Sequence, residues 1–506
     1  MTRSDTTDTA DATRAGPGSG EDGLDPNRWK ALWVTLVAGF MILLDVSIVA
    51  VAIPSMQRGL GTTPAEVQWV VSGYALTFGL ALVPAGRLGD AIGRRRMFMI
   101  ALAGFVLFSA LAGAAPNATM LVLARLAQGI AAGALAPQNS ALIQQLFRGT
   151  ERGRAFGFFG ATVGISTAVG PIAGGLILAL AQGPDGWRWI FYVNVPIGVI
   201  ALLLAARLIP RTDSGSPGHL DVLGTGLLGG AVLALLLPLV ESDSGGLTRL
   251  WWLFPVAAVL AAAFVVWERR VARHGGEPLL DVRLLTSRPG YASGVALATI
   301  YFIGFSGIWL VFALYFQTGL GYTPLQSGLA VTPFALGSAA SSVVGGRLVA
   351  RLGRLLTVMG LSLVVIGLAA VGIVLATAPA HAAGLLVAAP LLVAGIGGGW
   401  VISPNTTMTL RYVPVASAGS AGGALQTGQR IGSAIGTATI TGIFYAVLAS
   451  SGGDFRRAVA VAVGGATLGA VVALVVGVLE WRTGRKRAGL TETPVPSGDH
   501  PPPELC

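Results

Sequence analysis

Long apolar runs recur along this chain, each about as long as a helix that crosses a lipid bilayer. Such a helix needs about 20 mainly apolar residues. Fourteen segments qualify, near residues 31–52, 67–86, 97–115, 120–140, 156–180, 189–208, 220–240, 250–267, 291–316, 324–346, 355–377, 383–404, 419–447 and 457–480. With 53% hydrophobic and only 11% charged residues, the chain cannot cover itself with an ordinary soluble surface. The sequence predicts an all-α integral membrane protein with fourteen transmembrane helices.

Basic residues are unevenly divided between the loops on the two sides of this arrangement. When the loops are assigned alternately, most of the 33 lysines and arginines fall on the side of both termini. The opposite side carries only Arg58, Arg188, Arg249, Arg456 and Arg457. By the positive-inside rule, we expect a multi-pass protein of the cell membrane with both termini in the cytoplasm. Topology and lipid headgroups then explain the net charge of +10, and no nucleic-acid partner is needed.

Several classes of chemistry are excluded by residues that the sequence lacks. Its two lysines, Lys30 and Lys486, do not follow glycine, so there is no Gly-Lys phosphate loop and ATP is not expected as a direct energy source. Cys506 is the only cysteine, which rules out an intrachain disulfide and a thiolate metal cluster. We find no metal-ligand spacing and no hydrolase motif. The sequence therefore predicts no enzyme, no metal and no cofactor.

An internal echo indicates two related halves. "GRLGDAIGRRR" (86–96) matches "GRLVARLGR" (346–354) at an offset of 260, with Ala350 in place of Asp90, and "GIAAGALAP" (129–137) weakly matches "GIGGGWVISP" (395–404). Homologous bundles that meet at a midplane site are typical of secondary transporters. The predicted organisation is a disordered cytoplasmic tail (1–30), a six-helix bundle (31–208), two inserted helices with a cytoplasmic linker (209–290), a second six-helix bundle (291–480) and a basic, Pro-rich cytoplasmic tail (481–506).

Four stretches carry a resemblance to a known family. "GRLGDAIGRRR" resembles motif A of the major facilitator superfamily, and "RLAQGIAAGA" (125–134) resembles its motif B. "GISTAVGPIAGG" (164–175) resembles motif C, which marks antiporters in that superfamily. "LLDVSIVAVAIP" (43–54) is similar to the first-helix motif of the fourteen-helix drug:proton antiporters, with Ser47 and Ala50 in place of the usual Thr and Asn.

This resemblance implies proton-coupled efflux of an amphipathic small molecule, such as a drug, antibiotic or secondary metabolite, by alternating access. The proton gradient would be the energy source, and the partners would be the cargo, protons and the bilayer. One alternative is a transporter of a metabolite, lipid or siderophore, although motif C counts against import. A non-transporting sensor or scaffold is another, but it needs no charges inside its helices. The oligomeric state stays open, with a monomer plausible.

Asp45 is the acid that most needs an explanation. It lies about 21 Å into its helix at 1.5 Å per residue, and an ionised Asp at the bilayer centre costs about 2.5–3.5 kcal/mol on insertion scales. We expect Asp45 to face a wet interior. The resemblance implies a proton-coupling role for Asp45, with Arg125 of motif B beside the cavity tuning its protonation. The alternatives are an Asp45 pinned by one hydrogen bond and an Arg125 that reaches the outer headgroups.

Motif A is expected to form a gating loop from Gly86, Arg87, Asp90, Gly93 and Arg94. The glycines would permit a short turn, and Asp90 would accept hydrogen bonds from a helix N-terminus or pair with Arg94. In the family this loop is thought to hold the outward-facing state by gripping a neighbouring helix. The alternative is a basic loop that only sets topology.

Motif C places small residues and one proline at helical spacings, at Gly164, Gly170, Pro171, Gly174 and Gly175. Small residues permit close helix contact, and a proline removes one backbone hydrogen bond. We expect a tight, bendable helix, with ordinary small-residue packing as the alternative.

Cargo contacts are the least constrained part of the prediction. The candidates for the cavity are Trp69, Tyr74, Trp309, Tyr315, Phe316, Trp400, Asn405, Gln426 and Arg430, and helix packing or lipid contact is the alternative for each aromatic. Arg430, deep in a predicted helix, favours a neutral or anionic cargo, unless it lies at the bilayer edge. Segment 324–346 has no acid, which argues against a dication.

Overall fold

The structure is a computed structural model. It describes residues 25–491 except 63, 182, 212–220, 242–244, 275, 277 and 281–282. Most of the predicted N-terminal tail, and the predicted C-terminal tail beyond residue 491, lie outside these described residues. So does part of the predicted linker between the two bundles.

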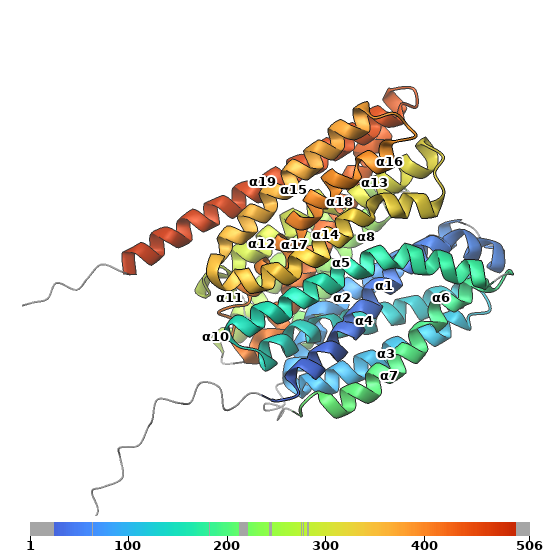
Figure 1. The fold of residues 1–506 in the computed structure, drawn as a ribbon. Helices are drawn as coiled ribbons and strands as arrows, with labels where there is room; N and C mark the ends of the chain where they lie inside the picture. The colour runs from blue at the N-terminus through green and yellow to red at the C-terminus, as the bar shows by residue number, and fades with distance from the viewer. Residues whose placement is uncertain are drawn as a thin grey trace, which may run out of the picture.

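The described residues fold into helices and their connections, with no strand among them (Figure 1). The first part of the chain forms α1 (Arg28–Leu60), α2 (Pro64–Ile92), α3 (Arg94–Gly113), α4 (Ala118–Leu146), α5 (Gly149–Leu180), α6 (Trp189–Tyr192) and α7 (Asn194–Leu208). The middle forms α8 (Val222–Val240), α9 (Gly246–Arg249), α10 (Leu253–Arg273) and α11 (Leu284–Ser287). The last part forms α12 (Tyr291–Phe305), α13 (Ile308–Leu314), α14 (Pro324–Leu352), α15 (Arg354–Thr377), α16 (Ala383–Leu386), α17 (Ala388–Thr409), α18 (Ala418–Ser450) and α19 (Phe455–Thr491).

Each of the fourteen predicted segments is helical, but fewer qualify as membrane spans. Within the described residues, 12 helices are long and apolar enough to cross a bilayer, or up to 13 if the bent α5 is one span. The helix left out is α10, whose last turns carry Glu268, Arg269 and Arg270. The all-helical membrane fold is confirmed, and the count of fourteen spans is not reached.

Two predicted boundaries are wrong for a shared reason. Gly86, Arg87 and Asp90 were expected in a loop, but α2 continues through them to Ile92, and the chain turns only at Gly93, where φ is 98°. Likewise, α19 continues to Thr491, past the expected end at residue 480. Apolar runs mark the part of a helix inside the bilayer, and a helix continues beyond the bilayer wherever its backbone hydrogen bonds are still made.

The helices gather in two groups that meet along their length (Figure 1). In the first part of the chain, α1 packs on α5, and α4 packs on both α2 and α3. In the last part, α14 and α15 pack on α17, α15 packs on α19, and α12 packs on α18. The groups meet where α5 lies against α14 and where α2 lies against α18. Helix α1 begins and α19 ends at the same end of the bundle, which we call the terminal end. The exact domain division stays a prediction.

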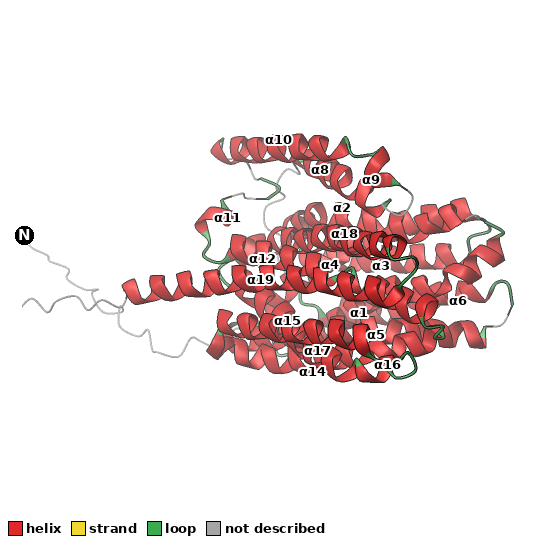
Figure 2. Cartoon of the chain, turned by 90° about the horizontal axis from the view of Figure 1, so that it is seen from above, coloured by secondary structure: helices red, strands yellow, loops and turns green. Residues whose placement is uncertain are grey.

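The two inserted helices form a hairpin on one side of the molecule. Helix α10 packs on α8, and α8 packs on α2 and α18. Figure 2 shows α8 and α10 at one edge of the bundle, with α14 at the opposite edge. Leu76 of α2 and Leu236 of α8 are buried in this contact, with Ile431 of α18 packed against them. The hairpin therefore covers one of the two junctions between the groups and leaves the other uncovered.

One span in the second group is discontinuous near the middle of the molecule. Helix α12 ends at Phe305 and α13 begins at Ile308, so Ser306 and Gly307 interrupt the helix. An ideal Cβ at Gly307 would lie 2.6 Å from the carbonyl oxygen of Gly436 on α18, so only glycine fits there without displacement. The Ser306 hydroxyl donates to the carbonyl oxygen of Ser433 at 2.8 Å. A broken helix of this kind is tolerated at membrane depth only where it is buried in protein or lines a cavity.

Candidate functional site

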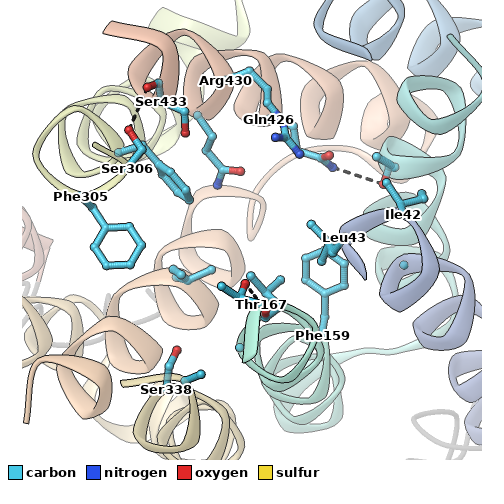
Figure 3. Close-up of a pocket in the computed structure, with 18 of the residues that line it drawn as sticks. Ile42, Leu43, Phe159, Thr167, Phe305, Ser306, Ser338, Gln426, Arg430 and Ser433 are labelled. Atoms are coloured by element: carbon cyan, nitrogen blue, oxygen red, sulfur yellow. Dashed lines mark hydrogen bonds between the residues drawn. The ribbon is translucent and has the colours of Figure 1, made fainter. Parts of the chain in front are cut away.

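A cavity of about 310 Å³ lies between the two groups of helices. Figure 3 shows side chains of α5 (Phe159, Thr167), α12 (Phe305) and α18 (Gln426, Arg430) around this shared space. Ile42 and Leu43 of α1, together with Ser338 of α14, complete its outline. Because both halves contribute to the wall, relative movement of the halves must change the shape of the cavity.

One wall of the cavity is aromatic. The ring of Trp309 lies edge-on to Phe334 at 4.9 Å between centroids, and Phe305 lies 5.2 Å from each of the two. Phe305 is the last residue of α12 and Trp309 is near the start of α13, so the interruption between these helices turns both rings to one wall. Such a surface fits an apolar or aromatic part of a ligand.

The facing wall is polar and carries one cation. Gln426, Gln429 and Arg430 of α18 line it, with Asn139 and Ser140 of α4 nearby. Within the described part of the chain, no hydrogen bond or ion pair is found for the Arg430 guanidinium, which lies 4.2 Å above the ring of Phe78. The side-chain oxygen of Asn139 is buried and has no partner among the described residues. The cavity thus offers a cationic group and unused hydrogen-bonding capacity.

Asp45 lies in a fully buried polar cluster behind the cavity wall. One of its oxygens is 2.5 Å from Nη1 of Arg125, and the other accepts from Nε2 of Gln128 and Nδ2 of Asn194, each at 3.1 Å. Arg125 also donates through Nε to the carbonyl oxygen of Val70 at 3.0 Å. Asp45 and Arg125 are 0% and 1% exposed. The cost of burying each charge is therefore offset by the ion pair and by these hydrogen bonds.

The expectation that Asp45 faces a wet interior is wrong for this conformation. Its side chain does not line the cavity and has no exposed surface. The physical reason is that two other helices supply its partners: Arg125 and Gln128 come from α4, and Asn194 comes from α7. Arg125 pairs with Asp45 and does not extend to the headgroups.

Two aromatic rings connect this cluster to the cavity. The guanidinium of Arg125 lies 4.1 Å from the ring centre of Tyr74, and the centre of Tyr74 lies 6.1 Å from that of Phe78. Phe78 lines the cavity and lies under Arg430. A continuous row of contacts therefore runs from the Asp45–Arg125 ion pair to the cation in the cavity wall.

Motif A residues join the two groups at the terminal end, at a junction that we call the first seam. Asp90 accepts hydrogen bonds from the backbone N–H groups of Gly419 and Ser420, each at 3.0 Å, and pairs with Arg94 at 3.1 Å. These N–H groups belong to the first turn of α18, where the helix dipole also favours a carboxylate. Arg94 in turn donates to the carbonyl oxygen of Val415 in the opposite group. Arg87 is half-buried nearby.

The role of Gly86 differs from the expected turn. It is helical, and an ideal Cβ on it would lie 2.3 Å from the carbonyl oxygen of Gly419. Glycine is needed there because the two backbones touch. The prediction for Gly93 fits its positive φ of 98°.

Motif C residues lie at two helix contacts of α5. An ideal Cβ at Gly170 would lie 2.3 Å from Cβ of Ser47, and one at Gly174 would lie 3.0 Å from Ile48 of α1. Gly164 faces α14, where its Cβ would lie 3.1 Å from the carbonyl oxygen of Ala335. Around Pro171, the helix segments on either side differ in direction by 45°. Gly175 has no neighbour within 4 Å of its Cβ position.

The predicted cavity residues divide into two sets. Trp309, Gln426 and Arg430 line the cavity. The other six lie outside its lining, at Trp69, Tyr74, Tyr315, Phe316, Trp400 and Asn405. Tyr315 and Phe316 are packed in the core of the second group, and Trp69 packs with the inserted hairpin. Asn405 binds Arg354 at the terminal end and donates to the carbonyl oxygen of Gly294 at 2.9 Å.

Sequence reasoning missed several residues that matter to this geometry. Gln128 and Asn194 complete the coordination of Asp45, and Phe305 and Thr167 line the cavity. The available signal was a polar side chain inside an apolar span, which Gln128 provides one helical turn from Arg125. No comparable signal distinguishes Phe305 from other aromatic residues.

Comparison with known proteins gives consistent matches along the chain. The sequence model described as Major Facilitator Superfamily matches residues 35–437 and 294–496. "Puromycin resistance protein pur8" of Streptomyces alboniger is 37% identical over 466 residues, covering 90% of this chain and 90% of that protein. "Probable actinorhodin transporter" of Streptomyces coelicolor is 34% identical over 447 residues, covering 87% of this chain and 75% of that protein.

Among solved structures, the human organic anion transporter MFSD10 has a similar fold. Its TM-score is 0.63, over 89% of this chain and 100% of that one. At 14% identity, this likeness concerns the fold alone.

Proposed function

The chain belongs to the Major Facilitator Superfamily, and from this premise we propose that it is a fourteen-helix drug:proton antiporter that exports amphipathic small molecules across the cell membrane. It is a transporter and not an enzyme. The names of its relatives, a puromycin resistance protein and an actinorhodin transporter, favour antibiotics or related secondary metabolites as cargo. The cavity between the two groups of helices is the proposed cargo site.

The proposed organisation is two six-helix bundles around the cavity, with α8 and α10 as an insertion. Both termini would face the cytoplasm. The excess of basic loop residues on the terminal side supports this orientation, and so does the shared end of the bundle at which α1 begins and α19 ends (Figure 1).

The observation that carries proton coupling is the buried Asp45–Arg125 ion pair. A proton on Asp45 would cancel its charge and end the pairing. Arg125 would then be a buried cation without its counter-ion, which is strongly unfavourable. The cluster would have to rearrange, so protonation favours a different arrangement of the helices that supply its partners. One proton moving inward supplies about 2.3 kcal/mol per 100 mV and about 1.36 kcal/mol per pH unit.

Coupling to cargo would run through packing contacts, because Asp45 does not line the cavity and the proton and cargo do not compete for one group. A shift of Arg125 acts on Tyr74, which contacts Phe78 beneath Arg430. Cargo that binds against Phe78 and Arg430 would be affected in turn. This row of contacts is the proposed link between the two binding events.

The cavity chemistry favours a neutral or anionic amphipathic cargo. An aromatic wall accepts a flat apolar group, and Arg430 with Gln426 and Gln429 offers donors to a carbonyl, hydroxyl or carboxylate group. No acid is among the described residues that line the cavity, so a cationic cargo would lack a counter-ion there. A dication is the least favourable cargo.

Inverted membrane vesicles test the proposal directly. With an acidic interior, the wild-type protein should accumulate a labelled neutral or anionic amphipathic antibiotic from the medium. Asp45→Asn should lose this pH-driven accumulation but keep exchange of labelled for unlabelled cargo, which needs no net proton movement. Asp185→Asn is the control, because Asp185 lies in an exposed turn. Equal pH-driven accumulation by Asp45→Asn and wild type would show that Asp45 does not couple the proton.

A further inference from the structure

The contact between α5 and α14 is the second seam between the two groups, and it holds a separate cavity of about 300 Å³. Trp29, Arg154 and Phe158 from the first group line this cavity, with Val343 and Arg347 from the second. Trp29 is the second residue of α1, which places the cavity at the terminal end of the bundle. None of these residues lines the central cavity.

Two arginine side chains line the cavity, and no group that neutralises their charge is found nearby among the described residues. Arg154 and Arg347 are exposed, and no hydrogen bond or ion pair is found for either within the described ranges. The acid in the first turn of α5, Glu151, is engaged by Arg28 through two hydrogen bonds of 3.0 and 3.2 Å. Arg152 of the same helix donates to the backbone of Arg411, which adds positive charge to the seam.

Comparison with the first seam shows that the second seam lacks an acidic residue at the position of Asp90. Gly86 and Gly346 are equivalent in the internal echo, and both touch a backbone of the opposite group, that of Gly419 and that of Gly153 respectively. In the first seam, Asp90 supplies a carboxylate that joins the two groups. Its equivalent in the second seam is Ala350. The second seam therefore closes with arginines from both sides and with no acid at this position.

The surroundings of the cavity point to the membrane as the source of an anion. Apolar side chains beside it are exposed, including Trp33 at 56% and Val344 at 46%. Trp29 and Trp33 both contact Phe158, as aromatic residues near a membrane interface commonly do. The inserted hairpin covers the first seam, but it lies on the opposite side of the bundle from α14 (Figure 2). Lipids can therefore reach the second seam directly.

We propose that this cavity binds the phosphate headgroup of an anionic phospholipid, which bridges Arg154 of the first group and Arg347 of the second. The guanidinium group matches phosphate geometry, often with two parallel hydrogen bonds. The bound phosphate supplies the negative charge that Asp90 supplies in the first seam. It joins the two groups of helices when the terminal end is closed. The binding site stands on its own, and only its effect on alternating access rests on the proposed function.

Native mass spectrometry of the purified full-length protein tests the site without any transport assay. The probes are phosphatidylglycerol, phosphatidylcholine of the same chain length, and inorganic phosphate. The wild type should retain phosphatidylglycerol preferentially. Arg154→Gln and Arg347→Gln should each weaken that binding about tenfold, the value expected for loss of one charge-assisted contact to phosphate. Arg207→Gln, an exposed arginine at the end of α7, should leave binding unchanged.

Lysine variants separate loss of the site from loss of the fold. Arg154→Lys and Arg347→Lys keep the charge and should retain most of the preference for phosphatidylglycerol, with a melting temperature like that of the glutamine variants. Unchanged phosphatidylglycerol binding in the double glutamine variant would overturn the proposal. So would full displacement of the lipid by millimolar inorganic phosphate, because the occupant would then be a soluble anion.

Discussion

The two seams at the terminal end close in the same way and are charged in different ways. In both, a helix of one half touches a helix of the other through glycine, at Gly86 with Gly419 and at Gly346 with Gly153. The first seam has Asp90 to join the halves and an inserted hairpin to cover it. The second has an alanine in that position, two exposed arginines with no partner found among the described residues, and direct access to lipid. The two seams therefore share a close backbone contact at glycine. They differ in whether the chain itself supplies the negative charge.

This difference suggests that the two halves of a duplicated fold can be joined by two different sources of negative charge. A carboxylate fixed in the chain gives the first seam a constant strength. A seam that takes its anion from the bilayer has a strength that depends on the lipid around it. In this proposal, the Asp90 carboxylate stabilises closure of the first seam, and the phosphate of a bound lipid stabilises closure of the second.

The largest effects are expected where a side chain is added to the shared backbone contact. In Gly86→Ala the new Cβ would lie 2.3 Å from the oxygen of Gly419, and in Gly346→Ala it would lie 2.4 Å from the oxygen of Gly153. Overpacking costs about 1–3 kcal/mol, so each variant should slow export about tenfold or more in a vesicle assay. Gly175→Ala should export normally, because nothing lies within 4 Å of its Cβ position. Normal export by either seam variant would show that close backbone contact is not needed.

Removing the acid from the first seam should have the next largest effect. Asp90→Asn loses a charged acceptor for Gly419 and Ser420 and the pairing with Arg94. Hydrogen bonds to a charged group are worth about 1.5–3 kcal/mol, so the closed terminal end should be populated about tenfold less. Labelling of single cysteines placed in the cavity measures this, after Cys506→Ser removes the native thiol. Ala350→Ser at the equivalent position of the second seam should change nothing, and equal labelling of both variants would contradict the comparison.

A third test concerns Glu480, an acid of the second half that pairs with the equivalent of Arg94, whereas Ala350 stands at the position of Asp90. Arg354 is the last residue of the echo of motif A and pairs with Glu480 of α19 at 3.0 Å, with both side chains largely buried. Arg354→Gln would leave Glu480 without this partner and should lower the free energy of unfolding by about 2 kcal/mol, less than the 3–5 kcal/mol of a fully buried pair. Thermal unfolding in detergent measures this loss.

The control is the ion pair of Arg188 with Asp185, whose aspartate side chain is 67% exposed. Asp185→Asn should change stability by no more than about 1 kcal/mol from loss of the ion pair. The double variant Arg354→Gln/Glu480→Gln should be more stable than the sum of the two single changes predicts, because neither group is left alone. Strict additivity would mean that the pair does not interact.

The smallest effect is expected from restoring an acid to the second seam. In Ala350→Asp the new carboxylate lies three residues from Arg347 on α14, and such helical pairs are worth about 0.2–0.5 kcal/mol. It should compete with lipid phosphate and weaken phosphatidylglycerol binding about twofold in native mass spectrometry. Ala350→Asn, which has a similar size and no charge, should bind lipid as the wild type does. Stronger binding by Ala350→Asp would rule out the proposed role for charge.

The sequence predicts the helices of this protein well because a bilayer imposes a length and a composition on each span. It also indicates the charged groups at the first seam, because the resemblance to motif A specifies the acceptor Asp90 and the donor Arg94 at fixed spacing. The surroundings of Asp45 were not predictable in the same way. They depend on Gln128 and Asn194, which are 83 and 149 residues away in the chain.

The cavity wall was harder to predict, because a membrane helix is apolar on every face. Periodicity then says little about which side of the helix faces the centre. Trp309 faces the cavity, whereas Tyr315, less than two turns later, lies in a short π-helical turn (Tyr315–Gly319) and points into the core. Trp400 packs against Gly345 and Gly360, glycines of two other helices. Only the three-dimensional arrangement distinguishes these aromatic residues.

The backbone contacts at Gly86 and Gly346 have a consequence for the speed of the transport cycle. Surfaces built from long side chains lose rotamer freedom each time they meet, and that entropy cost is about 1–2 kcal/mol for each flexible side chain. Glycine has no side chain to immobilise, so the two halves can dock and separate many times with little rearrangement at the line of closure. Rapid turnover then depends on the few charged groups around that line, which set how long each docking lasts.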